Sequence, residues 1–294
     1  MTYVVGGHKI TVNLFCGDKP LDKLLPSFAS FKTEDGGEKL FTLDVCEHLE
    51  ALPSDERRLI REVDTGNGIT QVSKLNDGGY QFVVRNIDDE VCALIICNED
   101  FSKCRCMISG GLSMMRFGLN NTLMLVYAFS AARRDTLLVH ASVVRHNGVA
   151  YAFTAKSGTG KSTQVANWIR NIEGCDIVND DNPIFRFIDG KAVLYGSPWS
   201  GKTPCYRNIT VPLAALMLIK RDERNYVKEQ NPIIAFSTLL TACSAMKWDE
   251  TLFEKVCGTV SRIVENIKVA ELHCTPDAES AFVCRRYLED DTID

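Results

Sequence analysis

The feature that most constrains this chain is a glycine-containing loop between an apolar stretch and an amphipathic stretch. Residues 149–153 are apolar and predict a strand, and residues 155–162, Ala-Lys-Ser-Gly-Thr-Gly-Lys-Ser, follow almost directly. Apolar side chains then recur at helical spacing, at Val165, Ala166, Trp168 and Ile169. Strand, glycine loop and helix in this order are the local context that a phosphate-binding loop requires.

The residues of this loop have the chemistry to bind phosphate. Gly158 and Gly160 let backbone N–H groups converge on an anion at a helix N-terminus, where the helix dipole adds a favourable potential. Lys161 supplies a positive charge for the outer phosphates, and Ser162 supplies a hydroxyl for Mg²⁺. We therefore expect the loop to bind a nucleotide, ATP with Mg²⁺. The expected phosphate-binding residues are Ser157, Gly158, Thr159, Gly160, Lys161, Ser162 and Thr163.

One position departs from the usual pattern of such loops. Ala155 stands where the first glycine is expected. A methyl group there narrows the allowed backbone angles but leaves the two later glycines, the lysine and the serine in place. The alternative interpretation is a glycine turn that caps a helix without a ligand. The order of strand, loop and helix favours a working nucleotide site.

Two adjacent acids end a short apolar strand after the predicted helix. Asp180 and Asp181 follow Ile177 and Val178, and a phosphate loop needs a carboxylate on a neighbouring strand to complete the Mg²⁺ shell. Adjacent carboxylates point in different directions, so they can divide the work. One of them can bind the metal while the other takes the proton from an incoming hydroxyl. A solvated turn with a capping aspartate is the structural alternative.

Two further polar features lie near this set in the sequence. His140 lies within the apolar run 137–144, which predicts the strand before the loop strand. It either hydrogen-bonds the catalytic carboxylate and sets its charge or is a satisfied core histidine. A second glycine loop, residues 196–202, either covers the nucleotide with Lys202 on a phosphate or closes the core as a Pro-Trp turn. Arg207 is a further candidate for a phosphate contact.

The pattern of elements divides the chain near residue 110. Residues 1–110 alternate short apolar runs with turn signals such as 76–79, Asn-Asp-Gly-Gly, which is typical of an antiparallel β-rich region. Residues 111–294 begin with apolar residues at helical spacing and then alternate strands and helices. We therefore expect an α/β domain at 111–294 after a β-rich region at 1–110, an α+β fold overall.

Composition excludes several kinds of partner. The net charge is −5 and basic residues occur singly or in pairs, so nucleic acid is not an expected partner. No apolar run approaches the roughly 20 residues that span a bilayer, and the N-terminus lacks a signal-peptide pattern. We expect a cytoplasmic protein without a membrane partner. The 12 cysteines are scattered and predict reduced thiols rather than a metal site.

Four of these motifs together resemble the catalytic domain of HPr serine kinase/phosphorylase-like proteins, which belong with phosphoenolpyruvate carboxykinase-type folds. The motifs are Leu-Val-His140-Ala-Ser, the phosphate loop, the pair Asp180-Asp181 and the second glycine loop, all within residues 137–288. The resemblance implies a P-loop kinase domain with a mixed sheet and flanking helices. It also implies Lys161 on the β and γ phosphates, Ser162 and Asp181 on Mg²⁺, Asp180 as base and His140 beside the acids. A homo-oligomer is one of the assemblies that the resemblance allows.

Three functions follow as hypotheses. The leading one is a kinase that transfers the γ-phosphoryl group of ATP to a hydroxyl of a protein, peptide or small molecule. Thr163 stands where the true HPr enzymes carry an acidic residue, and with Ala155 it motivates a second hypothesis. That second hypothesis is a nucleotide-sensing or partner-binding module without catalysis. The third is a carboxykinase-like enzyme, although the additional metal-binding His and Lys of those enzymes are not found.

Overall fold

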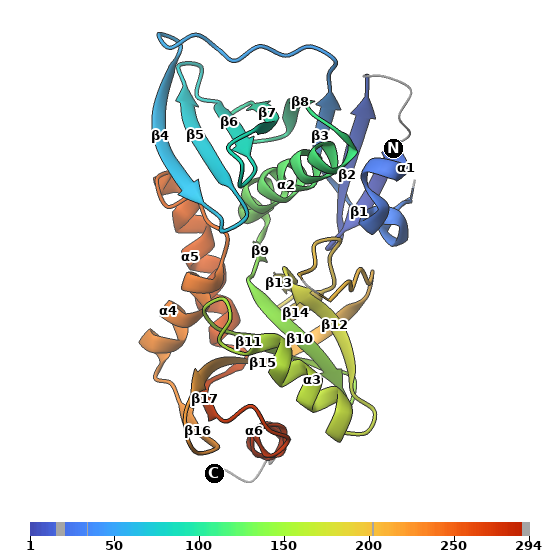
Figure 1. The fold of residues 1–294 in the computed structure, drawn as a ribbon. Coiled ribbons are helices and arrows are strands. Elements are labelled where there is room, and N and C mark those ends of the chain that lie inside the picture. Colours follow the sequence, from blue (N-terminus) through green and yellow to red (C-terminus); the bar gives the residue numbers. More distant parts are fainter. Residues whose placement is uncertain (16–20, 34, 202, 290–294) are drawn as a thin grey trace. The chain divides into compact units, whose positions relative to one another are not determined.

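The chain divides between Ala131 and Ala132 into two units, Met1–Ala131 and Ala132–Asp294 (Figure 1). The computed structural model describes residues 1–15, 21–33, 35–201 and 203–289. Each unit is built on a sheet that contains both parallel and antiparallel pairs. The chain is therefore a mixed α/β protein with two mixed sheets. No helix within the described ranges has the length and apolar character needed to cross a membrane.

The first unit is a sheet of eight strands in the order β1-β2-β3-β8-β7-β6-β5-β4. Its strands are β1 (Thr2–Val5), β2 (His8–Leu14), β3 (Glu38–Val45), β4 (Arg57–Asp64), β5 (Ile69–Leu75), β6 (Tyr80–Arg85), β7 (Val91–Cys97) and β8 (Lys103–Ile108). The short helices α1 (Leu21–Leu24) and η1 (Pro26–Phe31) lie between β2 and β3. The turn signal at residues 76–79 joins β5 to β6, whereas β1 and both short helices escaped prediction.

The expectation of an antiparallel region is only partly correct. Strands β4 to β8 form an antiparallel meander, but β2 pairs with β3 and β3 pairs with β8 in parallel. Tight turns join antiparallel neighbours, whereas parallel neighbours need a crossover connection. The helices α1 and η1 lie in one crossover, and the strands β4 to β7 lie in the other.

Helix α2 (Leu112–Ala131) belongs to the first unit, so the division falls later than the expected boundary at residue 110. The helix contacts β3, β6, β7 and β8 (Figure 1). Leu119, Leu123 and Val126 are among its buried side chains. A side-chain carbon at Gly118 would collide with the carbonyl oxygen of Cys92, so this glycine permits the close packing on β7. Burial of its apolar side chains ties the helix to the first sheet.

The second unit is a sheet of nine strands, with β12-β10-β11-β15-β14-β13-β9 along its main path, β17 paired with β15, and β16 paired with β17. Its strands are β9 (Thr136–Leu138), β10 (Ala141–His146), β11 (Val149–Thr154), β12 (Asp176–Asp181), β13 (Ile184–Ile188), β14 (Lys191–Tyr195), β15 (Thr210–Arg221), β16 (Tyr226–Glu229) and β17 (Lys268–Cys274). Its helices are η2 (Ala132–Arg134), α3 (Lys161–Asn171), α4 (Pro232–Ala242), α5 (Glu250–Val264) and α6 (Glu279–Glu289).

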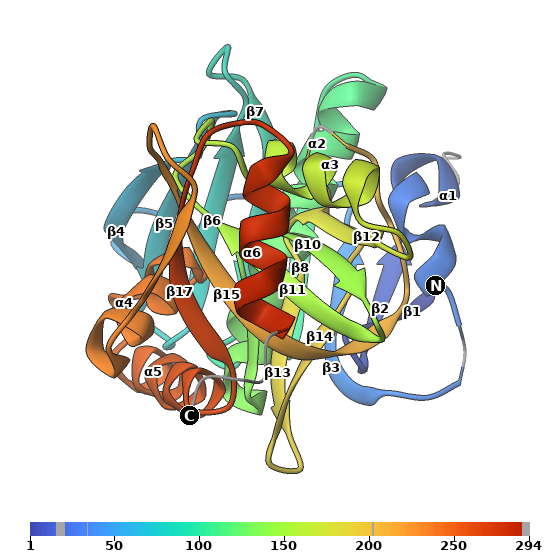
Figure 2. The same cartoon turned by 90° about the horizontal axis from the view of Figure 1, so that it is seen from below.

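The parallel centre of this sheet positions the phosphate loop. Strand β15 lies between β11 and β17 and runs parallel to both. In such sheets the carboxyl ends of parallel strands meet at one edge, where ligands bind. The loop follows β11 at this edge and continues into α3, which packs on α6 (Figure 2). Trp168 of α3 is fully buried against Tyr151 and Phe153 of β11. These ring contacts hold the helix that follows the loop against the strand that precedes it.

The strand expected over residues 137–144 is interrupted at His140. Strand β9 ends at Leu138 and β10 begins at Ala141. Val139 donates its N–H to the carbonyl of Pro183, and His140 donates its N–H to the carbonyl of Ala242. Because these partners replace the ladder of a continuous strand, the expectation that His140 lies inside a strand is wrong. Its side chain is 44% exposed, so it is not a core histidine.

Candidate active site

The phosphate loop combines two glycines that need special backbone angles with an alanine that does not. Gly158 and Gly160 have φ angles of 76° and 134°, in the region that favours glycine. Ala155 is not among the residues with positive φ, so its methyl group causes no backbone strain. Gly160 is the N-cap of α3, and glycine has no side chain with which to cap the first N–H groups of the helix. These N–H groups suit an anion.

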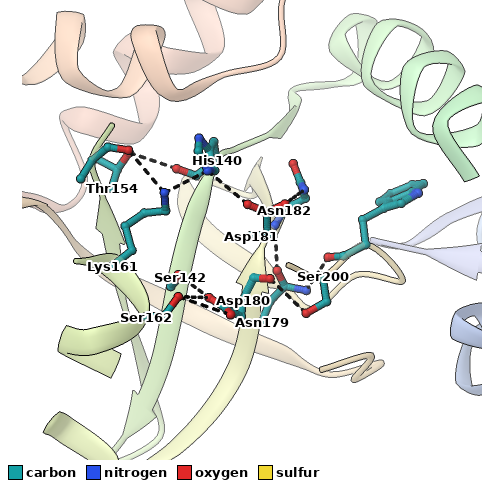
Figure 3. A network of polar contacts seen from close by, with 12 residues as sticks. His140, Ser142, Thr154, Lys161, Ser162, Asn179, Asp180, Asp181, Asn182 and Ser200 are labelled. Atoms are coloured by element: carbon teal, nitrogen blue, oxygen red, sulfur yellow. Dashed lines mark hydrogen bonds and ion pairs between the residues drawn. The ribbon is translucent and has the colours of Figure 1, made fainter. Parts of the chain in front are cut away.

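Asp180 lies between two hydroxyl groups (Figure 3). Ser142 donates its hydroxyl to Oδ1 of Asp180 over 2.6 Å, and Ser162 donates to the same oxygen over 3.1 Å. Ser142 and Asp180 are direct partners in the register of β10 and β12, while Ser162 belongs to the first turn of α3. Asp180 is only 3% exposed. Sheet pairing therefore fixes this carboxylate beside the loop serine.

The neighbouring acid takes part in a different set of contacts (Figure 3). Oδ1 of Asp181 lies 3.1 Å from Nε2 of His140, and Nζ of Lys161 lies 2.9 Å from the same nitrogen. Asn182 donates its side-chain N–H to Oδ2 of Asp181 over 2.7 Å. The φ angle of Asp181 is 128°, which residues other than glycine rarely adopt. Asp181 therefore combines an unusual backbone conformation with a side chain that faces His140 and not Ser162.

Two groups, the carboxylate of Asp181 and the ammonium of Lys161, contact the same nitrogen of His140. An imidazole nitrogen either donates a proton or accepts one, so Nε2 cannot donate to Asp181 and accept from Lys161 together. Partial burial lowers the pKa of Lys161, and the carboxylates of Asp181 and Asp180 oppose this shift. An anion on the loop would draw Lys161 towards itself and favour its charged form. The His140 proton would then be free to hold Asp181.

Two hollows flank the loop. The α4 hollow has a volume of about 780 Å³, and its lining includes His140, Ser157, Lys220, Ile234, Thr238 and Thr241. The α3 hollow has a volume of about 410 Å³, and its lining includes Gly160, Thr163, Gln164, Asp222 and Pro276. Arg221 lines both hollows and donates to the carbonyls of Gly158 and Thr159. The guanidinium of Arg221 therefore supports the crest of the loop between the two hollows.

Comparisons with known proteins do not assign the chemistry of this site. No family model matches the sequence, and no curated protein matches it. Among solved structures, the HPr(Ser) kinase/phosphatase from Coxiella burnetii is similar over 51% of this chain and 95% of that chain, with a TM-score of 0.32 and 10% identity. Values this low assign neither a family nor an activity.

The second glycine loop supports the acids by packing and hydrogen bonding. Trp199 is 3% exposed, and Asn179 donates to its carbonyl over 3.1 Å. Ser200 donates its hydroxyl to the backbone carbonyl of Asp180 over 3.0 Å. The described residues of this segment therefore pack as a turn that closes the core would require, and coverage of a nucleotide by the loop stays a prediction. Lys202 lies outside the described residues, so its contact with a phosphate stays a prediction.

Arg207 does not contact the phosphate loop. Its guanidinium donates to Oδ2 of Asp176 over 2.7 Å, and Arg145 donates to both oxygens of the same carboxylate over 2.9 and 2.7 Å. Burial alone would raise the pKa of Asp176, but these hydrogen bonds outweigh it and hold the pKa below its ordinary value. In this arrangement the guanidinium of Arg207 is directed to Asp176 and to the carbonyl of Ile177, and its contact with a phosphate stays a prediction.

Sequence reasoning missed several polar groups that complete the site. Ser142 contacts Asp180 only because β10 and β12 pair in a particular register, which no local pattern encodes. Asn179 and Ser200 contribute through the second glycine loop. Helix α4 reaches the site because Ala242 accepts the backbone N–H of His140. A polar residue such as Ser142 within an apolar strand is the one local signal that was available.

Proposed function

We propose that the second unit is a P-loop phosphotransferase of the HPr kinase/phosphoenolpyruvate carboxykinase type that transfers the γ-phosphoryl group of ATP to a hydroxyl. The proposal rests on one observation, which is that two adjacent carboxylates contact different groups of the site. Asp180 lies beside the loop serine, and Asp181 lies beside His140. Phosphoryl transfer requires oxygen ligands for a metal ion and a group that accepts the proton of the acceptor. Both are within reach of one phosphate loop here.

The residues around Ser162 fit Mg²⁺. Among the described residues, no group of three or more His, Cys, Asp or Glu could hold a metal ion. Mg²⁺ does not need such a cage, because it keeps water and substrate phosphates as ligands beside one or two carboxylates. The hydroxyl of Ser162 and the carboxylate of Asp180 are oxygen donors of the right kind. When bound, Mg²⁺ would neutralise charge on the outer phosphates of ATP.

This assignment reverses the roles expected from the sequence for the two acids. Asp181 is paired with His140 and Asn182, whereas Asp180 shares its oxygen with the loop serine. We therefore assign Asp180 to the metal and Asp181 to the proton. The neighbouring contacts support this division, because a metal ligand must lie beside Ser162 and a base must lie where an acceptor can approach.

The chain's own groups then have defined parts in the reaction. The acceptor oxygen bonds to the γ-phosphorus, the bond from the γ-phosphorus to the β–γ bridging oxygen breaks, and ADP leaves. The acceptor's proton passes to the carboxylate of Asp181, which His140 orients through Nε2. Lys161 moves from His140 to the γ-phosphate and offsets its negative charge. Gly158, Thr159 and the first turn of α3 hold the phosphates in place.

The acceptor reaches Asp181 through the α4 hollow. His140, the partner of Asp181, lines this hollow and is not among the residues that line the α3 hollow. Its remaining walls offer hydroxyls of α4 such as Thr238 and Thr241, an apolar side chain at Ile234 and a cation at Lys220. A volume of about 780 Å³ admits a small molecule or a short segment of a peptide or protein.

The test is transfer of labelled γ-phosphate from Mg-ATP, catalysed by the purified protein, to acceptors in a lysate of cells that lack this gene. We expect label on an acceptor with the native protein and loss of that label with Lys161→Ala. Absence of nucleotide binding would overturn the proposal. Tight binding of Mg-ATP without transfer to any acceptor would instead support the nucleotide-sensing module.

A further inference from the structure

We propose that the α3 hollow binds the nucleoside half of the nucleotide, with the Gln164 amide and the Asp222 carboxylate as its polar contacts. The inference rests on the proposed function, because the phosphates must lie on the loop for a nucleoside to reach the hollow. The hollow begins at Gly160 and Thr163, at the start of α3, and extends to Asp222 and Pro276. A nucleotide whose phosphates lie at the N-terminus of α3 therefore has this hollow directly beside it.

Gln164 provides a buried polar group that lacks a partner. Its side chain is 2% exposed, and its Oε1 accepts a hydrogen bond from Ser280 over 2.9 Å. Its Nε2 has no hydrogen-bond partner in the described part of the chain. Turning the amide over would leave the oxygen without a donor instead. Because buried polar atoms almost always have a partner, a ligand atom in the hollow would satisfy this amide. The edge of a nucleobase carries both donors and acceptors.

Asp222 provides a carboxylate whose position is fixed from several sides. The backbone N–H of Glu223 donates to its Oδ1 over 2.7 Å, and Nδ1 of His273 lies 3.0 Å from its Oδ2. The hydroxyl of Tyr226 donates to Oδ2 over 3.2 Å, and the rings of Tyr226 and His273 stack with centroids 4.4 Å apart. Hydrogen bonds from His273 and Glu223 hold the pKa of Asp222 below its ordinary value.

The sign of this charge limits what the hollow can bind. The carboxylate of Asp222 repels phosphate groups in its own part of the hollow, whereas the guanidinium of Arg221 lies on the side of the loop, where it donates to the carbonyls of Gly158 and Thr159. Hydroxyl groups are donors that a carboxylate accepts, and the ribose of a nucleotide carries two of them next to the base. Asp222 therefore fits the sugar, and we expect it to distinguish a ribonucleotide from its 2′-deoxy form.

The size and the apolar walls of the hollow agree with a base. Its volume of about 410 Å³ is within the usual range of small-molecule sites. Ile219, Cys274 and Pro276 contribute apolar surface to its lining. Such surface suits the faces of an aromatic ring, while the Gln164 amide suits its polar edge. The polar and apolar parts of the hollow thus match one class of ligand, a nucleoside.

Calorimetric titration with Mg-ATP, Mg-2′-deoxy-ATP and inorganic tripolyphosphate tests this site. We expect the native protein to bind ATP roughly tenfold or more tightly than tripolyphosphate. Gln164→Met should weaken ATP about fivefold and leave tripolyphosphate unchanged, since one hydrogen bond is lost. Asp222→Asn should reduce the preference for ATP over its 2′-deoxy form. Gln230→Met is the matched control, because its Nε2 also lacks a partner within the described ranges but Gln230 does not line the hollow.

The outcomes separate this inference from the proposed function. Equal affinity of the native protein for ATP and tripolyphosphate would overturn the nucleoside site and leave the phosphate loop intact. Unchanged ATP affinity in both the Gln164 and Asp222 variants would also overturn it, and two variants guard against a folding defect in one of them. Failure of the native protein to bind any of the three ligands would overturn the proposed function itself.

Discussion

The two hollows beside the phosphate loop differ in what they bring to it. The α4 hollow, of about 780 Å³, is lined by His140, which contacts both Asp181 and Lys161. The α3 hollow, of about 410 Å³, is lined by Gln164 and Asp222. The first therefore has a group that can move a proton, and the second has groups suited to hold a ligand. If this division is correct, substitutions should separate transfer of phosphate from affinity for the nucleotide.

The largest effect is expected from Asp181→Asn. Loss of the proposed base should lower the rate of phosphoryl transfer by about 10²- to 10⁴-fold. Affinity for Mg-ATP should change by less than about twofold, because Asp181 is paired with His140 and not with the loop serine. Single-turnover transfer and calorimetric titration measure the two quantities. A parallel loss of ATP affinity would contradict the assignment of Asp181 to the α4 side of the loop.

Asp180→Asn should instead weaken the binding of Mg²⁺. Removing a carboxylate that lies 3.1 Å from the Ser162 hydroxyl should lower Mg²⁺ affinity in the presence of ATP by roughly 10- to 100-fold. Titration of Mg²⁺ at constant ATP, with chelator as the metal-free reference, measures this change. Asp176→Asn on the same strand is the matched control and should leave the Mg²⁺ titration unchanged. If Asp180→Asn left it unchanged as well, Asp180 would not be the metal ligand.

A bulky side chain in the α4 hollow should block the acceptor but not the nucleotide. Thr241→Trp places an indole in this hollow, and we expect transfer to an external acceptor to fall roughly tenfold. Affinity for Mg-ATP should stay the same. Ile233→Trp is the control, because Ile233 lies on the same helix, is 80% exposed and does not line the hollow. An equal loss of transfer in both variants would show that the hollow is not the route of the acceptor.

Asp176→Asn should affect stability and its pH dependence without affecting either hollow. The pKa of Asp176 lies below its ordinary value because Arg145 and Arg207 donate to it. Its stabilising effect is therefore present above the unfolded pKa of about 3.9 and is lost as the pH falls through the folded pKa. The substitution should lower the melting temperature by about 2 °C at pH 7. The difference from the native protein should shrink as the pH falls below 4, and a constant difference would contradict this account.

Ala155→Gly should have the smallest effect. Because Ala155 is not among the residues with positive φ, glycine gains no backbone freedom that the loop requires. We expect the affinity for Mg-ATP to change by less than about twofold, measured by calorimetry. A large gain in affinity would mean that the methyl group limits the loop, and it would favour the non-catalytic interpretation of the native site.

Elements with strong local signals were predicted well. Strand β11 covers the stretch expected at residues 149–153, helix α3 contains the amphipathic stretch at 165–169, and the turn at 76–79 joins β5 to β6. Turns with glycine and asparagine bound these strands, and the glycine loop marks the start of the helix. The positions of the loop, Lys161 and Ser162 at the start of the helix therefore follow from the sequence, because strand, loop and helix are contiguous in it.

Features that depend on distant partners were not predictable. The short elements β1, η1 and β16 lack a strong pattern of their own, and β1 and β16 exist through pairing with β2 and β17. The break at His140 arises because Pro183 and Ala242 accept backbone N–H groups there. Parallel pairing of β2, β3 and β8 likewise depends on crossovers that leave no turn signal.

The phosphate loop is what the sequence by itself determined, since strand, glycines, lysine and serine are contiguous. The division between Asp180 and Asp181 was decided only by the tertiary structure. In sequence they are two identical neighbours, but pairing of β10 with β12 places Asp180 against Ser142 and beside Ser162. A φ angle of 128° accompanies the contact of Asp181 with His140. The register of two strands and one unusual backbone angle are tertiary properties, and they separate the proposed metal ligand from the proposed base.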